Sequence, residues 1–504
     1  MSLHIEIGDL KKVSEDLISC PLGTNLMEAL CFCKIDLPFV CAGAGTCGRC
    51  RIKLLEGEAP LTDAESRLLS AEDIEAGIRL ACQVEVTGGL VIELLDDADM
   101  AVPKTYITQK EAAASYSFAI DIGTTTIAVA AVNDATGEVF DEYTGLNHER
   151  SYGADVISRI LAALNGYGPR MRDLIINDID TAIGAIVERN SLRVEGLNRI
   201  VIAGNTTMLH IFAGYSLEGL ATAPFTPVTL ELTKTDSGIM LPGISAFVGA
   251  DIVAGMYDTG AFSGEDISLF IDLGTNGEMA LGTKDRILVA STAAGPAFEG
   301  ASLSSGTGSV PGAISDVHLS DEDDEEPITL TLIEGSDSIT GICGSGIIAL
   351  AAELRRNGLL SEEGRLDERL GGRLKLTEDG RIKVTQKDIR ELQLAKAAIR
   401  AGIETLMFTY GITADEIDHV YLAGGFGQGV DVAKAAAIGL IPAELIDVTK
   451  AVGNTSLKGA VRFIREPDAQ QKLSAIIAAS GEVVLADNEY FSKAFMANMD
   501  FPKL

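Results

Sequence analysis

The chain has 504 residues, 47% of them hydrophobic, which is more than one core accommodates, so we expect three or four compact units. Its 40 basic and 73 acidic residues give a net charge of −33, which argues against nucleic acid or an anionic membrane as a partner, because both present negative phosphate groups. No apolar run approaches the roughly 20 residues that a membrane span needs, and the start of the chain lacks the charged-then-apolar order of an export signal. We therefore expect a cytoplasmic protein.

The first hundred or so residues combine short apolar runs with most of the cysteines. Strands are expected at 4–7, 12–17, 52–55 and 90–94, and a helix is expected at 25–33. Seven of the eight cysteines precede position 83. In a chain expected to be cytosolic, such clustering indicates a metal centre more than a set of disulfides.

A glycine-rich loop carries three of these cysteines at a spacing suited to an iron-sulfur cluster. Cys41, Cys47 and Cys50 lie on the loop CAGAGTCGRC, and Cys82 follows after 31 intervening residues. Three thiolates on a tightly curled loop that aims backbone N–H groups at the sulfides, together with one distant thiolate, form the arrangement that holds a [2Fe-2S] cluster. Zinc would usually require two separated C-x2-C pairs, and this region has one.

At these residues the region resembles the [2Fe-2S] ferredoxins, and the resemblance implies a β-grasp fold over residues 1–95. Plant-type loops have four residues between their first two cysteines, whereas this loop has five, as in the adrenodoxin-like branch. The remaining cysteines lack such spacing and are interpreted as buried thiols: Cys20, Cys31, Cys33 and Cys343. Residues 96–117 lose periodicity around Pro103, so we interpret them as a linker.

Two copies of one motif organise the rest of the chain. Residues 118–126 read FAIDIGTTT and residues 269–277 read LFIDLGTNG, with Asp272 lying 151 positions after Asp121. In each copy an apolar strand ends in Asp, then Gly, then hydroxyl residues. Glycine permits a tight turn, the N–H groups and hydroxyls can face a phosphate, and the aspartate can hold a metal ion or its water. An ordinary hairpin turn is the alternative for either copy alone, but the pair indicates two related lobes that close on one polyphosphate.

A third polar segment follows a strand expected at 198–203. Gly204, Asn205 and Thr206 come directly after this strand and before an apolar helical run. They either place small polar groups and a helix N-terminus at the rim of a cleft, or simply begin a capped helix.

Several acidic residues have alternative interpretations. Glu299, in a glycine-rich loop, either positions a metal-bound water or caps the adjacent turn. Asp155 and Asp251 precede apolar helical runs, and we interpret both as helix N-caps. The acidic run at 321–326 is interpreted as a solvated loop, because it lacks the spaced ligands and glycine of a calcium loop.

Two glycine-rich segments lie in the second half of the chain. Residues 339–346, which include Gly344, open an apolar helix at 347–354, where glycines allow close helix packing. A strand at 419–423 runs into GGFGQG at 424–429, whose glycines let the backbone approach a nucleotide. This loop does not fit the dinucleotide-binding pattern, and the sequence contains no P-loop motif.

The order of these segments resembles the ATPase superfamily of acetate and sugar kinases, Hsp70 and actin, in which two ribonuclease-H-like lobes bind ATP. The resemblance implies an α+β and α/β multidomain fold, with a first ATPase lobe at 118–265 and a second at 266–504. The catalytic candidates are Asp121, Asp272 and Glu299. The candidate cofactor-binding residues are Gly123, Thr124, Thr125 and Thr126 of the first motif, Gly204, Asn205 and Thr206, Gly274, Thr275 and Asn276 of the second motif, Gly344, and Gly424, Gly425, Phe426 and Gly427 of an adenosine loop.

With the cluster-binding domain in front, the whole chain is similar to the reductive activators of corrinoid-dependent methyltransfer proteins. The resemblance implies that ATP with Mg2+ drives one electron from the [2Fe-2S] cluster to a Co(II) corrinoid, which regenerates Co(I). It implies a corrinoid protein and a low-potential electron donor as partners, and it leaves a monomer or a homodimer open. The alternatives are an ATP-dependent reductase for another low-potential acceptor, and a non-catalytic protein whose partner binding switches with ATP and cluster state.

Overall fold

The computed structural model describes most of the chain, and the described residues form two compact units. These are Met1–Val102 with Leu146–Asp178, and Pro103–Gly145 with Ile179–Leu504. Among the described residues, no helix has both the length and the apolar character needed to cross a membrane. The residues outside the description are Met1, 9–10, Glu15, Lys34, Asp36, 38–42, Ala44, 46–47, Arg49, 96–114, Ala154, 301–302, 321–327, Asp337, 425–428 and Leu504.

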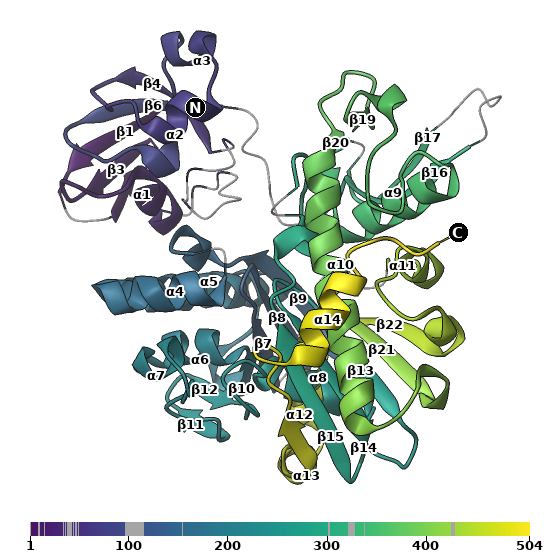
Figure 1. The fold of residues 1–504 in the computed structure, drawn as a ribbon. Coiled ribbons are helices and arrows are strands. Elements are labelled where there is room, and N and C mark those ends of the chain that lie inside the picture. Colours follow the sequence, from purple (N-terminus) through teal and green to yellow (C-terminus); the bar gives the residue numbers. More distant parts are fainter. Residues whose placement is uncertain are drawn as a thin grey trace. The chain divides into compact units, whose positions relative to one another are not determined.

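The first unit contains a six-stranded sheet of order β2-β3-β1-β6-β4-β5. β1 pairs in parallel with β3 and antiparallel with β6, so the sheet is mixed (Figure 1). The strands are β1 (Ser2–Ile7), β2 (Lys11–Ser14), β3 (Leu17–Cys20), β4 (Arg51–Glu56), β5 (Ile78–Leu80) and β6 (Leu90–Leu94). The helical segments are α1 (Leu26–Phe32), α2 (Asp63–Leu68), α3 (Ala71–Glu75), η1 (Ala81–Gln83), η3 (His148–Ser151), α4 (Val156–Ala162), the π-helical turn η4 (Ala163–Tyr167) and the first part of α5 (Gly168–Asn190).

The helix α1 lies close to its expected position. The side chain of Asn25 caps its first turn by accepting a hydrogen bond from Met27 N, and Leu26 and Leu30 are fully buried in the core of this sheet. The single strand expected at 12–17 is wrong, because the chain turns at Asp16 and forms the separate strands β2 and β3.

The second unit contains two six-stranded sheets whose central strands have the same arrangement. Their orders are β11-β12-β10-β7-β8-β9 and β22-β21-β13-β14-β15-β23. β7 pairs antiparallel with β8 and parallel with β10, and β13 pairs antiparallel with β14 and parallel with β21. Asp121 and Asp272 lie near the ends of β7 and β13, so the two motifs occupy equivalent places in two related sheets, as the sequence repeat predicts.

The strands of these sheets include the two expected at 198–203 and 419–423 and the apolar runs of both motifs. They are β7 (Tyr116–Ile122), β8 (Thr126–Asn133), β9 (Val139–Leu146), β10 (Leu197–Gly204), β11 (Thr233–Thr235), β12 (Gly238–Met240), β13 (Ser268–Leu273), β14 (Gly277–Thr283), β15 (Arg286–Thr292), β21 (His419–Gly424), β22 (Thr449–Gly453) and β23 (Ser480–Glu482). Smaller sheets contain β16 (Ala313–Leu319), β17 (Ile328–Leu332), β18 (Gly341–Ile342), β19 (Arg373–Lys375) and β20 (Lys383–Thr385).

Helices pack around both sheets of the second unit (Figure 1). They are α6 (Thr206–Ala213), α7 (Glu218–Ala221), α8 (Ala250–Thr259), α9 (Gly344–Arg356), α10 (Gln386–Tyr410), α11 (Val432–Ala437), α12 (Thr455–Arg465), α13 (Ala469–Ala479) and α14 (Glu489–Ala497). The 3-10 turns are η5 (Val194–Gly196), η6 (Pro296–Glu299), η7 (Glu368–Leu370), η8 (Ala414–Glu416) and η9 (Ala443–Val448).

The helix α12 follows the second sheet in the chain but packs on the first. It contacts α8 and the strands β7 and β10 (Figure 1). The two helices approach closely through glycines: a Cβ on Gly255 would lie 2.7 Å from Thr455 Oγ1, and a Cβ on Gly459 would lie 2.2 Å from Ala254 O. The close crossing brings the first turn of α12 to the end of β7, where Asp121 lies.

Candidate active site

Both copies of the repeated motif form tight hairpin turns. The N–H of Gly123 donates to Thr126 O at 2.9 Å, and the N–H of Gly274 donates to Asn276 O at 2.9 Å. A Cβ on Gly123 would lie 2.8 Å from Thr126 O, so the first turn needs glycine. Both copies are therefore hairpin turns. Backbone hydrogen bonds close these turns, so the hydroxyl and aspartate side chains are not needed to form them.

Glu299 brings the two turns together. Its Oε2 atom accepts a hydrogen bond from Thr125 Oγ1 at 2.8 Å and another from Thr275 Oγ1 at 2.6 Å. Thr125 belongs to the turn between β7 and β8, and Thr275 belongs to the turn between β13 and β14. Candidate residues from the two repeats thus meet at one carboxylate on η6.

The first turn of α12 fixes the orientation of Asp121. Ser456 Oγ donates to Asp121 Oδ1 at 2.7 Å, and Asn454 Nδ2 donates to Asp121 Oδ2 at 2.9 Å. Both oxygens of the carboxylate are therefore engaged by residues more than 300 positions away in sequence. Asn454 is also the N-cap of α12, and this local role contains no sign of the distant contact.

Asn205 caps α6, which is one of the two alternatives left open by the sequence, and it also contacts the first motif. Its Oδ1 accepts from Met208 N at 2.9 Å and caps α6, while its Nδ2 donates to Thr124 Oγ1 at 3.0 Å. The capping bond orients the side chain so that the amide reaches the first motif. Thr206 Oγ1 donates to Ser245 O at 2.8 Å and so anchors the start of α6.

Asp251 is not the helix N-cap that the sequence pattern predicts. The N-cap of α8 is Gly249, and the Asp251 carboxylate lies inside the first turn, where it accepts from Ile252 N at 2.9 Å. Glycine is required at the N-cap because a Cβ there would lie 2.7 Å from the Cα of Asn205. The parallel prediction for Asp155 is confirmed, since its carboxylate caps α4.

The carboxylates of the site repel one another. Burial raises the pKa of Asp251 to about 7, and the charge of Asp121 acts in the same direction. Burial raises the pKa of Asp272 to about 8, and the charges of Asp251 and Asp121 add to this effect. Burial also raises the pKa of Glu278 well above its ordinary value, with Asp251 as the next cause. Asp251 and Glu278 therefore interact electrostatically with the candidate residues Asp121 and Asp272, although neither was a site candidate from the sequence.

The position of Glu278 beside Asp272 could have been predicted from the sequence. It pairs directly with Asp272 across the hairpin of β13 and β14, and a hairpin of this length places the first and seventh residues of DLGTNGE opposite each other. The Oγ of Ser291 donates to Glu278 at 3.3 Å.

A divalent cation would be stabilised by this set of carboxylates. Carboxylate oxygens are the ligands that Mg2+ prefers, and a cation would offset the mutual repulsion. In the parts of the chain that the structure describes, no three His, Cys, Asp or Glu side chains converge as a ready-made metal centre. Mg2+ is usually held by one or two carboxylates together with water and phosphate oxygens, and carboxylates are the donor type present here.

The glycines expected near the nucleotide lie at two element ends. Gly344 is the first residue of α9, and Cys343 precedes it at the N-cap position. Gly424 ends β21 with a φ of +117°, and a Cβ there would lie 2.3 Å from Leu273 O, so this strand end lies directly against the end of β13. Gly425, Phe426 and Gly427 lie outside the described residues.

Two of the four candidate cluster ligands are described. Cys50 and Cys82 are buried, and the pairing of β4 with β5 continues into a hydrogen bond from Ala81 N to Cys50 O at 2.8 Å. Gln83 Nε2 donates to Cys82 Sγ at 3.5 Å and to Gly43 O at 3.2 Å, so it ties the cysteine loop to the turn that carries Cys82. The other two candidates, Cys41 and Cys47, lie outside the described residues.

The thiols without ligand spacing behave as core residues. Burial raises the pKa of Cys33 to about 11, and it raises the pKa of Cys20 as well. Both remain protonated at neutral pH, which a cluster ligand does not. Cys31 and Cys343 are also buried, as expected for small core residues.

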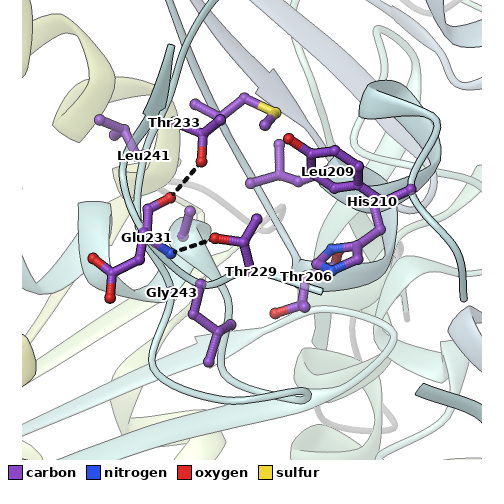
Figure 2. A pocket seen from close by; sticks show the side chains of 12 residues that line it. Thr206, Leu209, His210, Thr229, Glu231, Thr233, Leu241 and Gly243 are labelled. Carbon is purple, nitrogen blue, oxygen red and sulfur yellow. Dashed lines mark hydrogen bonds between the residues drawn. The ribbon is translucent and has the colours of Figure 1, made fainter. Parts of the chain in front are cut away.

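A separate pocket is lined by residues of α6, of the segment that contains β11 and β12, and by Ala250 at the start of α8 (Figure 2). It is a small pocket that is partly open to solvent. His210 on its wall is neutral, because Nδ1 must donate to Thr206 O at 2.7 Å while Nε2 accepts from Val228 N at 3.0 Å. Burial lowers the pKa of His210, so we assign it a structural role.

Comparison with known proteins covers almost all of the chain. Residues 12–87 match a 2Fe-2S iron-sulfur cluster binding domain, residues 116–262 match the RACo middle region, and residues 266–504 match the C-terminal domain of RACo, the ASKHA domain. The middle-region match carries Asp121, Asn205 and Asp251, and the C-terminal match carries the second motif and Glu299.

Two curated relatives and one solved structure match over most of their lengths. The chain is 32% identical over 427 residues to the corrinoid activation enzyme RamQ of Eubacterium limosum, covering 77% of this chain and 70% of the relative. It is 26% identical over 429 residues to the [Co(II) methylated amine-specific corrinoid protein] reductase of Methanosarcina barkeri, covering 77% of each. A reductive activator for corrinoid, iron-sulfur protein superposes with a TM-score of 0.72 at 26% identity, covering 99% of this chain and 98% of that one.

These matches confirm the fold class expected from the sequence, a ferredoxin-like domain joined to an actin-like ATPase fold. They also confirm the resemblance inferred from the cysteine loop and the repeated motif. The chain belongs to the RACo-like corrinoid activators.

Proposed function

We propose that the protein uses ATP to reduce the corrinoid of a partner protein from Co(II) to Co(I), and so returns it to methyl transfer. The names of both curated relatives describe corrinoid activation or reduction. The observation that carries the proposal is the meeting of the two repeated turns at Glu299, on a chain that also holds a cluster-binding domain.

The nucleotide would bind where the two turns meet. Thr124 and Thr125 from the first motif, and Thr275 from the second, offer hydroxyl donors to the phosphates of ATP. Asp121 and Asp272 would hold Mg2+, directly or through its water, and Mg2+ would supply charge neutralisation of the phosphates. Asn454 and Ser456 keep the Asp121 carboxylate in one orientation, which limits the reorganisation that binding requires.

The cluster would be held by Cys41, Cys47, Cys50 and Cys82. When bound, a [2Fe-2S] cluster supplies a single electron at low potential. Burial of Cys50 and Cys82 keeps water away from their sulfurs, and Gln83 places an amide donor beside Cys82. Both features adjust the potential at which a cluster gives up its electron.

ATP is needed because the electron moves to an acceptor of low potential. Each 59 mV by which the acceptor lies below the donor costs about 1.4 kcal/mol for one electron. Nucleotide binding offsets such a cost only if the ATP-bound form binds the partner in a state that accepts the electron more readily. The proposal therefore requires that ATP changes how this chain binds the corrinoid protein.

Three further parts of the proposal come from the sequence. The net charge of −33 and the grouping of the cysteines favour a cytoplasmic protein without nucleic acid or membrane as a partner. A separate low-potential protein or cofactor supplies the electrons. Whether one copy or a homodimer carries out the reaction is decided by measuring the mass of the active complex.

The test is anaerobic mixing of the reduced protein, Mg-ATP and a Co(II) corrinoid protein, followed by the cobalt absorbance. We expect Co(I) to form only with ATP, and we expect Asp272→Ala to lower the rate by about 100-fold or more, as for loss of a group that stabilises transferred phosphate. Asp285→Asn is the matched control, because it removes one exposed carboxylate from the turn between β14 and β15, at the other end of β14.

The two alternatives give other results in this experiment. Cluster oxidation with ATP turnover but no Co(I) would indicate another low-potential acceptor. ATP binding without turnover, in the presence of the corrinoid protein, would indicate a protein that only switches its partner binding. Equal Co(I) formation with and without ATP contradicts the proposal.

A further inference from the structure

The hydroxyl protons of Thr125 and Thr275 are both given to Glu299. The two hydrogen bonds, of 2.8 and 2.6 Å, end on the same oxygen, Oε2. A threonine hydroxyl carries one proton and can donate only one such bond. Neither hydroxyl can therefore donate to a phosphate oxygen while it is bonded to this carboxylate.

The Glu299 carboxylate also lies against the backbone of the second turn. A Cβ built on Gly274 would be 3.6 Å from Glu299 Oε1, and Gly274 N–H closes the turn by its bond to Asn276 O. The negative charge of Glu299 is among the causes that raise the pKa of Asp272. A polyphosphate placed at this turn would meet the same negative charge, and like charges at short range repel.

The backbone under Glu299 is firmly held. Phe298 is 1% exposed and Ala297 is 2% exposed, and both belong to the core of the second lobe. On the other side, Gly300 has a φ of +73° and approaches Thr307 so closely that a Cβ would lie 2.2 Å from its carbonyl oxygen. Because the η6 backbone is held in place, a change in the bonds of Glu299 to the two threonines requires rotation of its side chain rather than displacement of η6.

We propose that Glu299 gates the nucleotide site: its side chain bridges the two lobes through Thr125 and Thr275, and it rotates away before both hydroxyls bind the phosphates of ATP. This inference rests on the proposed function, in which the two turns bind those phosphates. It gives Glu299 a positioning role that differs from holding a metal-bound water. Nucleotide binding then replaces a bridge made by the protein with a bridge made by the phosphates.

The helices packed around η6 give this exchange a wider effect. η6 contacts both α9 and α10, and α9 begins at Gly344. A change from the Glu299 bridge to the phosphate bridge therefore acts on helices that pack together in the second lobe. The two lobes are then linked either through the Glu299 carboxylate or through the phosphates of ATP, depending on which of these Thr125 and Thr275 bind.

The test is equilibrium binding of Mg-ADP and of a non-hydrolysable Mg-ATP analogue to the full-length protein with its cluster, by titration calorimetry. We expect Glu299→Gln to bind the Mg-ATP analogue about tenfold more tightly than the unaltered protein, which corresponds to about 1.4 kcal/mol. Asp285→Asn, which removes an exposed carboxylate from the same lobe, leaves the affinity unchanged.

A double-mutant cycle separates the bridge from simple charge removal. In a Thr275→Val background one of the two competing hydrogen bonds is already absent, so we expect the gain from Glu299→Gln to fall to about threefold or less. Thermal unfolding of each variant confirms that it is folded. An undiminished gain in this background means that charge alone acts and overturns the gate.

The outcomes distinguish this inference from the proposed function. If the unaltered protein binds the Mg-ATP analogue and Glu299→Gln binds it equally or more weakly, the gate is wrong while the nucleotide site stands. If the unaltered protein binds neither nucleotide, the proposed function fails and the gate fails with it.

Discussion

Asn454 and Asp121 are joined by a hydrogen bond of 2.9 Å although 333 positions of sequence separate them. The bond links the start of α12, late in the chain, to the end of β7 in the first sheet. Ser456 adds a second bond to the same carboxylate at 2.7 Å. The orientation of a candidate catalytic group in the first lobe therefore depends on a helix that the chain supplies only after completing the second sheet.

Loss of the Ser456 hydroxyl should weaken nucleotide use without unfolding the protein. We expect Ser456→Ala to raise the KM for ATP by about tenfold or more, because a hydrogen bond to a charged group contributes about 1.5 to 3 kcal/mol net. The measurement is ATP turnover in the presence of a corrinoid protein. Ser456→Thr keeps the hydroxyl and should restore the KM.

Ser474→Ala is the control for this variant. Ser474 lies on α13 and bonds to Gln470 O in its own helix, so its hydroxyl has no part in the site. An equal change in KM for Ser474→Ala and Ser456→Ala would contradict the role assigned to Asp121 orientation.

The crossing of α8 and α12 should tolerate no side chain at Gly459. A Cβ there would lie 2.2 Å from the backbone oxygen of Ala254, so the two helices would have to move apart. We expect Gly459→Ala to lower the free energy of unfolding by about 1 to 3 kcal/mol, as other overpacked positions do. The measurement is thermal or urea unfolding.

Gly184→Ala provides the matched comparison. Gly184 is in the interior of α5, and a Cβ there meets no atom within 4 Å. Alanine should stabilise this helix by up to about 1 kcal/mol, because glycine is the poorer helix former. If both substitutions had the same effect, helix propensity and not the close crossing would control stability.

Lys396 should make stability rise at alkaline pH. Lys396 is 1% exposed, and its ammonium group donates to Asn498 O at 2.7 Å and to Asp500 O, with the Phe501 ring 5.1 Å away. Burial lowers the pKa of Lys396 to about 8, below its value in the unfolded chain. Above pH 8 the unfolded state binds the proton more tightly than the folded state does, so stability rises with pH until the unfolded chain also loses its proton.

The measurement compares unfolding free energies of the unaltered protein and of Lys396→Met at pH 8 and pH 9.5. Between these two pH values, we expect the unfolding free energy of the unaltered protein to rise relative to that of Lys396→Met by up to about 2 kcal/mol, at 1.36 kcal/mol per pH unit. Lys387→Met, at an exposed position on the same helix, should show no such change. A difference that stays constant between the two pH values would contradict the lowered pKa.

The parts of the site that could be predicted from the sequence are those fixed by neighbouring residues in the chain. Asp121 and Asp272 end apolar strands and precede glycine, so their places at two strand ends followed from strand burial and turn geometry. Asp251 was misassigned because the N-cap pattern ignores tertiary packing: the contact of α8 with Asn205 requires glycine at the cap. The Asn454 contact was unpredictable, since nothing near Asn454 indicates that α12 returns to the first sheet.

Cys82 and Cys343 are both buried, but only Cys82 lies beside the cysteine loop. Cys82 lies far from the cysteine loop in sequence, but the β4 and β5 pairing brings its turn beside Cys50. Cys343 is equally buried but belongs to a small cluster in the second lobe, where its thiol donates to Ile314 O at 3.2 Å. Burial therefore does not distinguish a cluster ligand from a core thiol, whereas position beside the loop does.

Replacement of Cys82 should remove the cluster while replacement of Cys343 should not. We expect Cys82→Ser, purified anaerobically, to lose most of its iron and its visible absorbance, because a thiolate ligand is missing. Cys343→Ser changes one buried thiol to a hydroxyl at a site without the cysteine loop and should keep two irons per chain, as one [2Fe-2S] cluster requires. ATP binding by Cys82→Ser should persist, since the nucleotide residues lie in the other unit. Full iron content in Cys82→Ser would exclude Cys82 as a ligand and would require a different fourth thiolate.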